Sequence, residues 1–142
     1  MRFDVSVNML AKQGKIDGQM TVFGGDQIRP NIHINDLVGV YRHFLEHPTL
    51  SCGAYNAGFE NLSIRSIAEM VQERTGAEII TTPSDDPRSY RQNSDKLLAT
   101  GFRPKKRVKD AIDEVIAGLE HGTLVDRDEW YTVRWMSRHI LK

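Results

Sequence analysis

The sequence predicts a small mixed α/β domain with about five helices and a few short strands. Two observations support this fold class: several segments repeat apolar residues every three or four positions, and short β-prone segments bounded by glycine lie between them. A chain of 142 residues fits one domain, and folding at this size buries roughly two-thirds of the unfolded surface. Without internal repeats or long linkers, we expect a single domain over residues 1–142.

The first half of the chain predicts a helix, a strand and an extended segment in that order. Phe3 to Gln13 has helical apolar spacing, and Gly14 is expected to end this helix. Met20 to Phe23 is β-prone and leads into Gly24-Gly25, whose glycines can adopt the positive φ of a turn. Arg29 to Ile34 should be extended, because Pro30 opposes a helix there.

The next helix is the most clearly patterned part of the sequence. Asn35 or Asp36 is expected to cap it, and Pro48 ends it. Its apolar stripe comprises Leu37, Val40, Tyr41, Phe44 and Leu45. Between Gly53 and Gly58, the residues 54–57 are expected to form a short strand.

The second half alternates helices with one further strand. Ser63 should cap a helix that Gly76 ends. The later elements expected are a strand over Ala77–Thr82, a helix over Ser94–Thr100 stopped by Gly101, and a helix over Val108–Leu119. The last segment, Asp126 to Leu141, has acidic residues first and basic residues last, as suits a helix dipole. We expect residues 123–142 to form a docking helix whose tryptophans contact the core or another subunit.

Composition limits the possible partners and compartments. Nineteen basic and nineteen acidic side chains cancel, so no overall field favours nucleic acid or an anionic membrane. The single cysteine, Cys52, excludes an internal disulfide and a Cys-rich zinc site. No apolar run is long enough for a membrane span, and Met1-Arg2-Phe3-Asp4 opens no signal peptide. We therefore expect a cytoplasmic protein with no nucleic-acid partner and no membrane partner.

Four ordered segments carry a resemblance to a known family. These are Gly24 to Leu37, Gly53 to Gly58, Ser63 to Gly76 and Asp85 to Gly101. Their order and spacing resemble the C-terminal, substrate-binding part of the NAD-dependent epimerase/dehydratases, which are nucleotide-sugar enzymes of the extended short-chain dehydrogenase type. The resemblance covers residues 2 to about 120 and implies the fold of that part.

The two motifs that carry redox chemistry in that family are absent from these residues. Gly14, Gly18, Gly24 and Gly25 never make the spacing of a dinucleotide-binding turn. No lysine lies four positions after any tyrosine: Tyr41, Tyr55, Tyr90 and Tyr131 are followed there by Leu45, Phe59, Ser94 and Trp135. We expect no catalytic residue, no bound cofactor and no activity of this chain alone. NAD is implied only for a complete family enzyme.

A nucleoside diphosphate sugar requires guanidinium groups for its pyrophosphate and backbone groups for its base. The resemblance implies that the strand backbone at Thr21 and Phe23 meets the base and that Arg29 contacts the pyrophosphate. Arg88 matches the second phosphate arginine of the family, and Arg91 is a further candidate. Asn8, on the first helix, would border the nucleotide. The alternative for these arginines is solvated surface, with Arg88 in a plain salt bridge to Asp85 or Asp86.

Two other polar features favour ordinary structural roles. His43 and His47 are one helical turn apart, but no third ligand accompanies them, so we expect no metal site. The basic run Arg103–Arg107 could attract phosphate, although a solvated connector is the simpler interpretation.

Three functions remain open. The first is a nucleotide-sugar-binding remnant of a truncated epimerase/dehydratase, without catalytic activity. The second is an interaction module or homo-oligomer, because the helix from Asp36 and the strand around Tyr55 would expose an apolar patch without the nucleotide-binding domain. The third is half of a split enzyme that a separate chain completes in trans.

Overall fold

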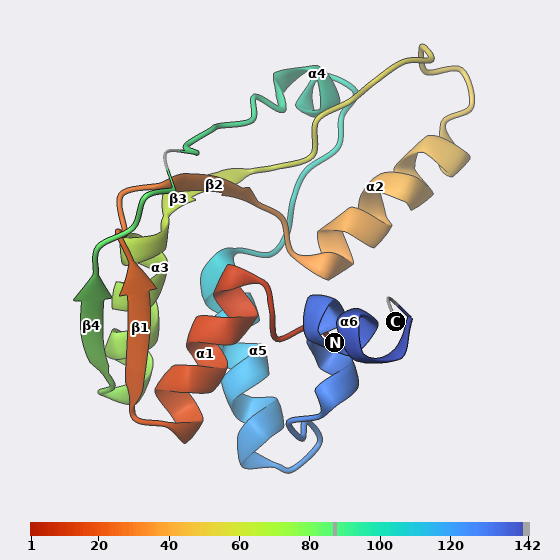
Figure 1. The fold of residues 1–142 in the computed structure, drawn as a ribbon. Coiled ribbons are helices and arrows are strands. Elements are labelled where there is room, and N and C mark those ends of the chain that lie inside the picture. The colour runs from red at the N-terminus through yellow and green to blue at the C-terminus, as the bar shows by residue number, and fades with distance from the viewer. Residues whose placement is uncertain (87, 141–142) are drawn as a thin grey trace.

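A computed structural model describes residues 1–86 and 88–140 of the chain (Figure 1). It confirms the predicted mixed α/β domain, with helices predominating over short strands. In chain order the elements are α1 Ser6–Ile16, β1 Gln19–Phe23, β2 Ile28–Asn31, α2 Ile34–Glu46, β3 Glu60–Ser63, α3 Ile64–Thr75, β4 Glu78–Thr82, α4 Asp95–Leu98, α5 Val108–Glu120, the 3-10 helix η1 Asp128–Trp130, and α6 Thr132–His139.

The strands form two small sheets joined by the predicted glycine turn. β1 and β4 are parallel, with Met20 opposite Ile79, whereas β2 and β3 are antiparallel, with Arg29 opposite Leu62. Gly24 and Gly25 have φ values of 70° and 111°, which residues with a Cβ atom rarely adopt. This turn redirects the chain out of the first sheet and into the second.

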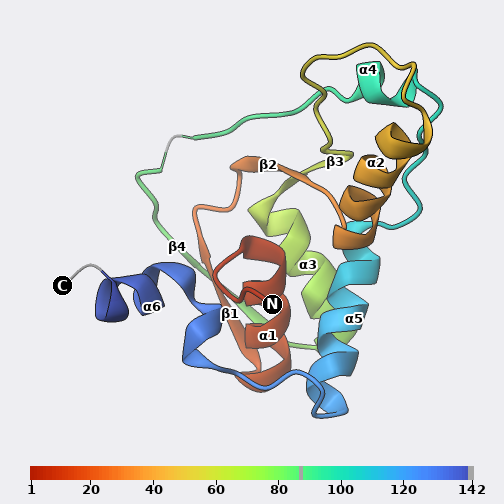
Figure 2. The same ribbon diagram turned by 90° about the vertical axis from the view of Figure 1, so that its right-hand side faces the viewer.

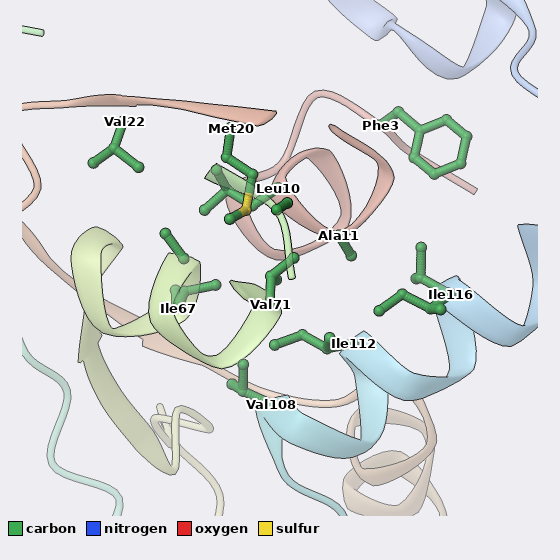
Figure 3. Packing of buried hydrophobic residues seen from close by; sticks show 13 residues of the cluster. Phe3, Leu10, Ala11, Met20, Val22, Ile67, Val71, Val108, Ile112 and Ile116 are labelled. Atoms are coloured by element: carbon green, nitrogen blue, oxygen red, sulfur yellow. The ribbon is translucent and has the colours of Figure 1, made fainter. Parts of the chain in front are cut away.

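In the main core α1 and α3 pack against β1, and α5 packs against α1 and α3 (Figures 1 and 3). Periodic apolar side chains from the three helices meet alternate side chains of β1 there. The buried set includes Phe3, Leu10, Ala11, Met20, Val22, Ile67, Ala68, Val71, Ala77, Val108, Ile112, Val115 and Ile116. The helix predicted to follow Ser63 and the helix predicted over Val108–Leu119 both contribute to this core.

A second, smaller core holds α2 against the chain around α4 (Figure 2). Val40, Leu97 and Phe102 form its buried centre. The buried Asp36 carboxylate accepts hydrogen bonds from the backbone N–H groups of Lys105 and Lys106, at 2.9–3.1 Å. The basic run is therefore tied through its backbone to α2.

Several helix ends differ from the prediction: α1 begins at Ser6 and not at Phe3, and α4 spans only Asp95–Leu98. α1 continues past Gly14 to Ile16, because the missing side chain of Gly14 makes room for Val71 of α3. α2 is capped by His33, whose Nδ1 accepts from the Asn35 N–H at 3.2 Å. Asn35 and Asp36 are not the cap, and the Asp36 carboxylate instead accepts hydrogen bonds from the backbone N–H groups of Lys105 and Lys106. The predicted cap at Ser63 is confirmed.

Two predicted elements are also corrected. Residues 54–57 are not a strand, because in the described part of the chain no strand pairs with them. Instead, the Ala54 carbonyl accepts from Lys96 Nζ at 2.9 Å. The single helix predicted over 126–141 is divided into η1 and α6, where Trp130 packs edge-on against Phe3 at 5.3 Å. Leu141 and Lys142, the last residues of the docking helix predicted over 123–142, lie outside the described residues.

None of the described helices is long and apolar enough to cross a membrane.

The packing at Gly14 predicts opposite effects of alanine at two helical glycines. A Cβ at Gly14 would lie 2.5 Å from Val71 Cγ1, whereas at Gly39 it would meet the Phe102 ring at an ordinary 3.5 Å. We expect Gly14→Ala to lower the free energy of unfolding by about 1–2 kcal/mol. Gly39→Ala should leave it unchanged or raise it by up to about 1 kcal/mol. Urea unfolding of both variants measures this, and equal effects would contradict the packing.

Candidate functional site

The candidate site begins at the turn between β1 and β2. The Gln27 side chain closes this turn: its Nε2 donates to the Phe23 carbonyl at 3.1 Å, and its Oε1 accepts from the Gly25 N–H at 2.9 Å. The chain then enters β2, which carries Arg29. The local sequence Gly-Gly-Asp-Gln therefore determines where the arginine leaves the turn.

A distant segment of the chain lies along the start of β2. The Ile28 N–H donates to Ser89 Oγ at 3.0 Å, and the Ile28 carbonyl accepts from the Tyr90 N–H at 3.2 Å. This pairing brings Arg88 next to Arg29, whose guanidinium donates to the Arg88 carbonyl. Arg29 also lies over the Tyr90 ring, 5.1 Å from its centroid. Two of the predicted site residues, 59 positions apart, are thus neighbours.

Both guanidinium groups converge on the carboxylate of Asp86. Arg88 binds it with two contacts, Nε to Oδ1 at 2.7 Å and Nη2 to Oδ2 at 2.8 Å, while Arg29 Nη2 lies 3.4 Å from Oδ2. The hydrogen bonds from Arg88 hold the pKa of Asp86 well below its usual range, and the same partnership raises the pKa of Arg88. The Arg88 side chain is 76% exposed and that of Arg29 only 20%. The salt bridge considered for Arg88 does form, and Arg29 shares it.

Thr21 and Phe23 occupy the edge of β1 that faces away from β4. The Gly24 N–H donates to Thr82 in β4, so the odd-numbered backbone groups of β1 point the other way. In the described part of the chain this edge has no neighbouring strand. The Thr21 N–H donates instead to the Gln13 side-chain amide at 3.3 Å, and the Phe23 ring is exposed. Side-chain amides of Gln13 and Gln27 thus already bond to this edge.

The remaining candidates lie apart from the arginine pair. Arg91 borders a hollow of about 420 Å³ that Asn61 and Gln92 also line. Asn8 donates from Nδ2 to the Arg2 carbonyl at 2.8 Å, which fastens the N-terminal segment to α1. Within residues 1–86 and 88–140, neither side chain hydrogen-bonds to Arg29 or Arg88.

Three contributors were not identified as such from the sequence: Gln27 as the clamp of the turn, Ser89 as a backbone tether and Tyr90 as the face for Arg29. All three lie within two residues of a predicted arginine. That proximity was the available signal, but the pairing of the segments is not encoded locally.

Lys12 and Tyr131 form a contact outside any Tyr-x-x-x-Lys spacing. Lys12 Nζ donates to Tyr131 Oη at 2.9 Å and pairs with Asp126 at 2.7 Å. Burial raises the pKa of the Tyr131 phenol. The contact fastens the C-terminal segment to α1.

The Asp86 contacts predict a pH effect that depends on Arg88. With Arg88→Gln, the pKa of Asp86 should rise toward its ordinary value of about 3.9, as a carboxyl-carbon NMR titration would show. Because the folded-state pKa is lowered, the stabilisation from this pair is present above the unfolded pKa and lost as pH falls through the folded one. Arg91→Gln is the control and should leave Asp86 unchanged. An unaltered Asp86 titration in Arg88→Gln would contradict the pairing.

Comparison with solved structures places this geometry in a known fold. No protein-family model matches the chain. It superposes on dTDP-glucose 4,6-dehydratase from Bacillus anthracis with a TM-score of 0.72 and 17% identity, covering 94% of this chain and 43% of that enzyme. It superposes on UDP-N-acetylglucosamine 4-epimerase from Bacillus cereus with a TM-score of 0.69 and 19% identity, covering 92% of this chain and 44% of that enzyme. For UDP-glucose 4-epimerase from Thermus thermophilus the TM-score is 0.66 and the identity 22%, with 81% of this chain and 40% of that enzyme covered.

The chain therefore spans less than half the length of the enzymes that it matches. At these identities the likeness shows a common fold. The resemblance to NAD-dependent epimerases and dehydratases is confirmed at the level of the fold: this chain is built like one part of such an enzyme.

Proposed function

We propose that these residues form the sugar-nucleotide-binding portion of an NAD-dependent epimerase/dehydratase and bind a nucleoside diphosphate sugar without catalysing its conversion. The observation that carries this proposal is the meeting of Arg29 and Arg88 across 59 residues of sequence. Two like charges held side by side favour an anion between them, and a pyrophosphate supplies two negative groups.

The arginine pair suits phosphate in geometry as well as charge. A guanidinium presents parallel N–H groups that bind phosphate and carboxylate in the same bidentate manner. Stacking on Tyr90 and the bond to the Arg88 carbonyl orient Arg29 before a ligand arrives. Such preorganisation lowers the entropy cost of binding.

The edge of β1 supports the nucleotide half of the proposal. At this edge the Thr21 N–H and the Phe23 carbonyl already bond to the side-chain amides of Gln13 and Gln27, so the edge accommodates amide-like partners, and the exposed Phe23 ring lies there. The similar structures include a UDP-N-acetylglucosamine 4-epimerase and a dTDP-glucose 4,6-dehydratase, and a UDP-glucose 4-epimerase from Thermotoga maritima was solved with UDP-glucose. A pyrimidine nucleoside diphosphate sugar is thus the first ligand to examine.

Isothermal titration calorimetry with UDP-, dTDP-, GDP- and CDP-sugars tests the proposal. We expect Arg29→Ala and Arg88→Ala each to weaken binding about tenfold or more, since a hydrogen bond to a charged group contributes about 1.5–3 kcal/mol. Arg42→Ala, on the exposed side of α2, is the control and should bind like the wild type. Binding that neither arginine affects, or turnover of a sugar nucleotide with added NAD, would refute it.

The exposed face of α2 favours a second function, in protein association. Ile34, Val38, Tyr41 and Leu45 are all exposed, and the Leu45 side chain is 82% accessible. A hollow of about 430 Å³ between α2 and residues 47–57 adjoins this face. Burying apolar surface stabilises by about 2.5 kcal/mol per 100 Å², so a covering chain would gain substantially. The cover could be a second copy or a nucleotide-binding chain that completes the enzyme in trans.

If the protein associates through α2, a charged residue on the apolar face of this helix should dissociate the complex. Leu45→Glu should shift sedimentation toward the monomer and abolish any turnover restored by a separate nucleotide-binding chain. Lys109→Glu, on the exposed surface of α5, should change neither property. A wild-type chain that sediments as a monomer at every concentration and gains nothing from such a partner would exclude this function.

A further inference from the structure

We infer that Asp86 is a built-in competitor of the ligand: its carboxylate lies between Arg29 and Arg88, where a phosphoryl group would bind, and must be displaced first. This inference rests on the proposed anion site and assigns a regulatory role to a residue beside it. The consequence is an affinity below what the two arginines would provide without the competing carboxylate.

The carboxylate makes the contacts that a phosphate would make. One guanidinium holds both of its oxygens through Nε and Nη2, which is the fork arrangement shared by Arg–carboxylate and Arg–phosphate pairs. The second guanidinium, that of Arg29, contacts Oδ2 at 3.4 Å. Asp86 thus stands in for an anion that touches both arginines at once.

Asp86 is attached so that it can leave without disturbing the core. It lies between β4 and α4, outside any helix or strand, and its carboxylate is about 30% exposed. Its other hydrogen bonds are local, from its own N–H to Ser84 Oγ at 3.2 Å and from the Arg88 N–H to Oδ1 at 3.1 Å. Arg29 is held instead by backbone carbonyls and by Tyr90, so displacement moves the acid while Arg29 stays in place.

In this competition a carboxylate with one negative charge is exchanged for a pyrophosphate group with two. Two arginines and one aspartate leave a single net positive charge at the site, whereas a pyrophosphate group brings two negative charges. If the aspartate stays nearby after displacement, it also repels the incoming anion. Neutralising Asp86 removes both penalties and keeps the shape of the side chain.

The test compares Asp86→Asn with Asp85→Asn, which removes the same formal charge from the adjacent exposed position. Calorimetry with inorganic pyrophosphate at low ionic strength should show about three- to tenfold tighter binding to Asp86→Asn than to the wild type. Asp85→Asn should stay within about twofold, because a neighbouring surface charge acts only weakly. Added salt should shrink the difference. Asp86→Ala should behave like Asp86→Asn if its fold is intact by circular dichroism.

Equal or weaker pyrophosphate binding by Asp86→Asn, compared with Asp85→Asn, would overturn the inference and make Asp86 a support of the arginines. The proposed function is judged separately, with sugar nucleotides. If the wild type binds sugar nucleotides through Arg29 but Asp86→Asn binds pyrophosphate no more tightly, the proposed function stands and the role of Asp86 as a competitor is rejected. Tighter pyrophosphate binding by Asp86→Asn, without any binding of sugar nucleotides, would support Asp86 as a competitor and reject the proposed function.

Discussion

The turn at Gly24 and Gly25 is the constraint on which the site and its surroundings depend. The Gly24 N–H bonds to the end of β4, and the Gly25 carbonyl accepts from the Arg65 N–H at the start of α3. One pair of residues with positive φ thus fastens the first sheet to the helix that packs on it and sends the chain into β2. A bulkier residue at either position would strain the backbone and displace Arg29 from its neighbours.

From that turn onward, the site is assembled by contacts between distant parts of the chain rather than by a compact motif. The backbone of Ile28 receives the 88–90 segment, and this brings the second arginine beside the first. The ion pairs that Arg29 and Arg88 form with Asp86 are individually weak, since exposed ion pairs contribute at most about 1 kcal/mol. A ligand that engages both arginines would gain from their arrangement, and Asp86 shows that an anion fits there.

Local chemistry accounts for what could be predicted from the sequence. The glycine turn and the Ser63 cap follow from the conformational and hydrogen-bonding preferences of those residues, and the amphipathic helices follow from their periodicity. The failures involve distant partners. Gly14 stays helical because Val71 packs on it, and Asp36 leaves the cap to His33 because it binds the backbone of the basic run.

The same distinction applies to the candidate site. A resemblance to a family singled out Arg29 and Arg88, but no local rule states that the two meet or that Asp86 lies between them. Nitrogen–proton NMR of the arginine Nε–H groups during titration with a UDP-sugar tests this arrangement most directly. We expect the Arg29 and Arg88 signals to move together while the Asp86 carboxyl signal shifts toward that of a solvated carboxylate. Signals that move only elsewhere, or an Asp86 that keeps its partners in the bound state, would contradict it.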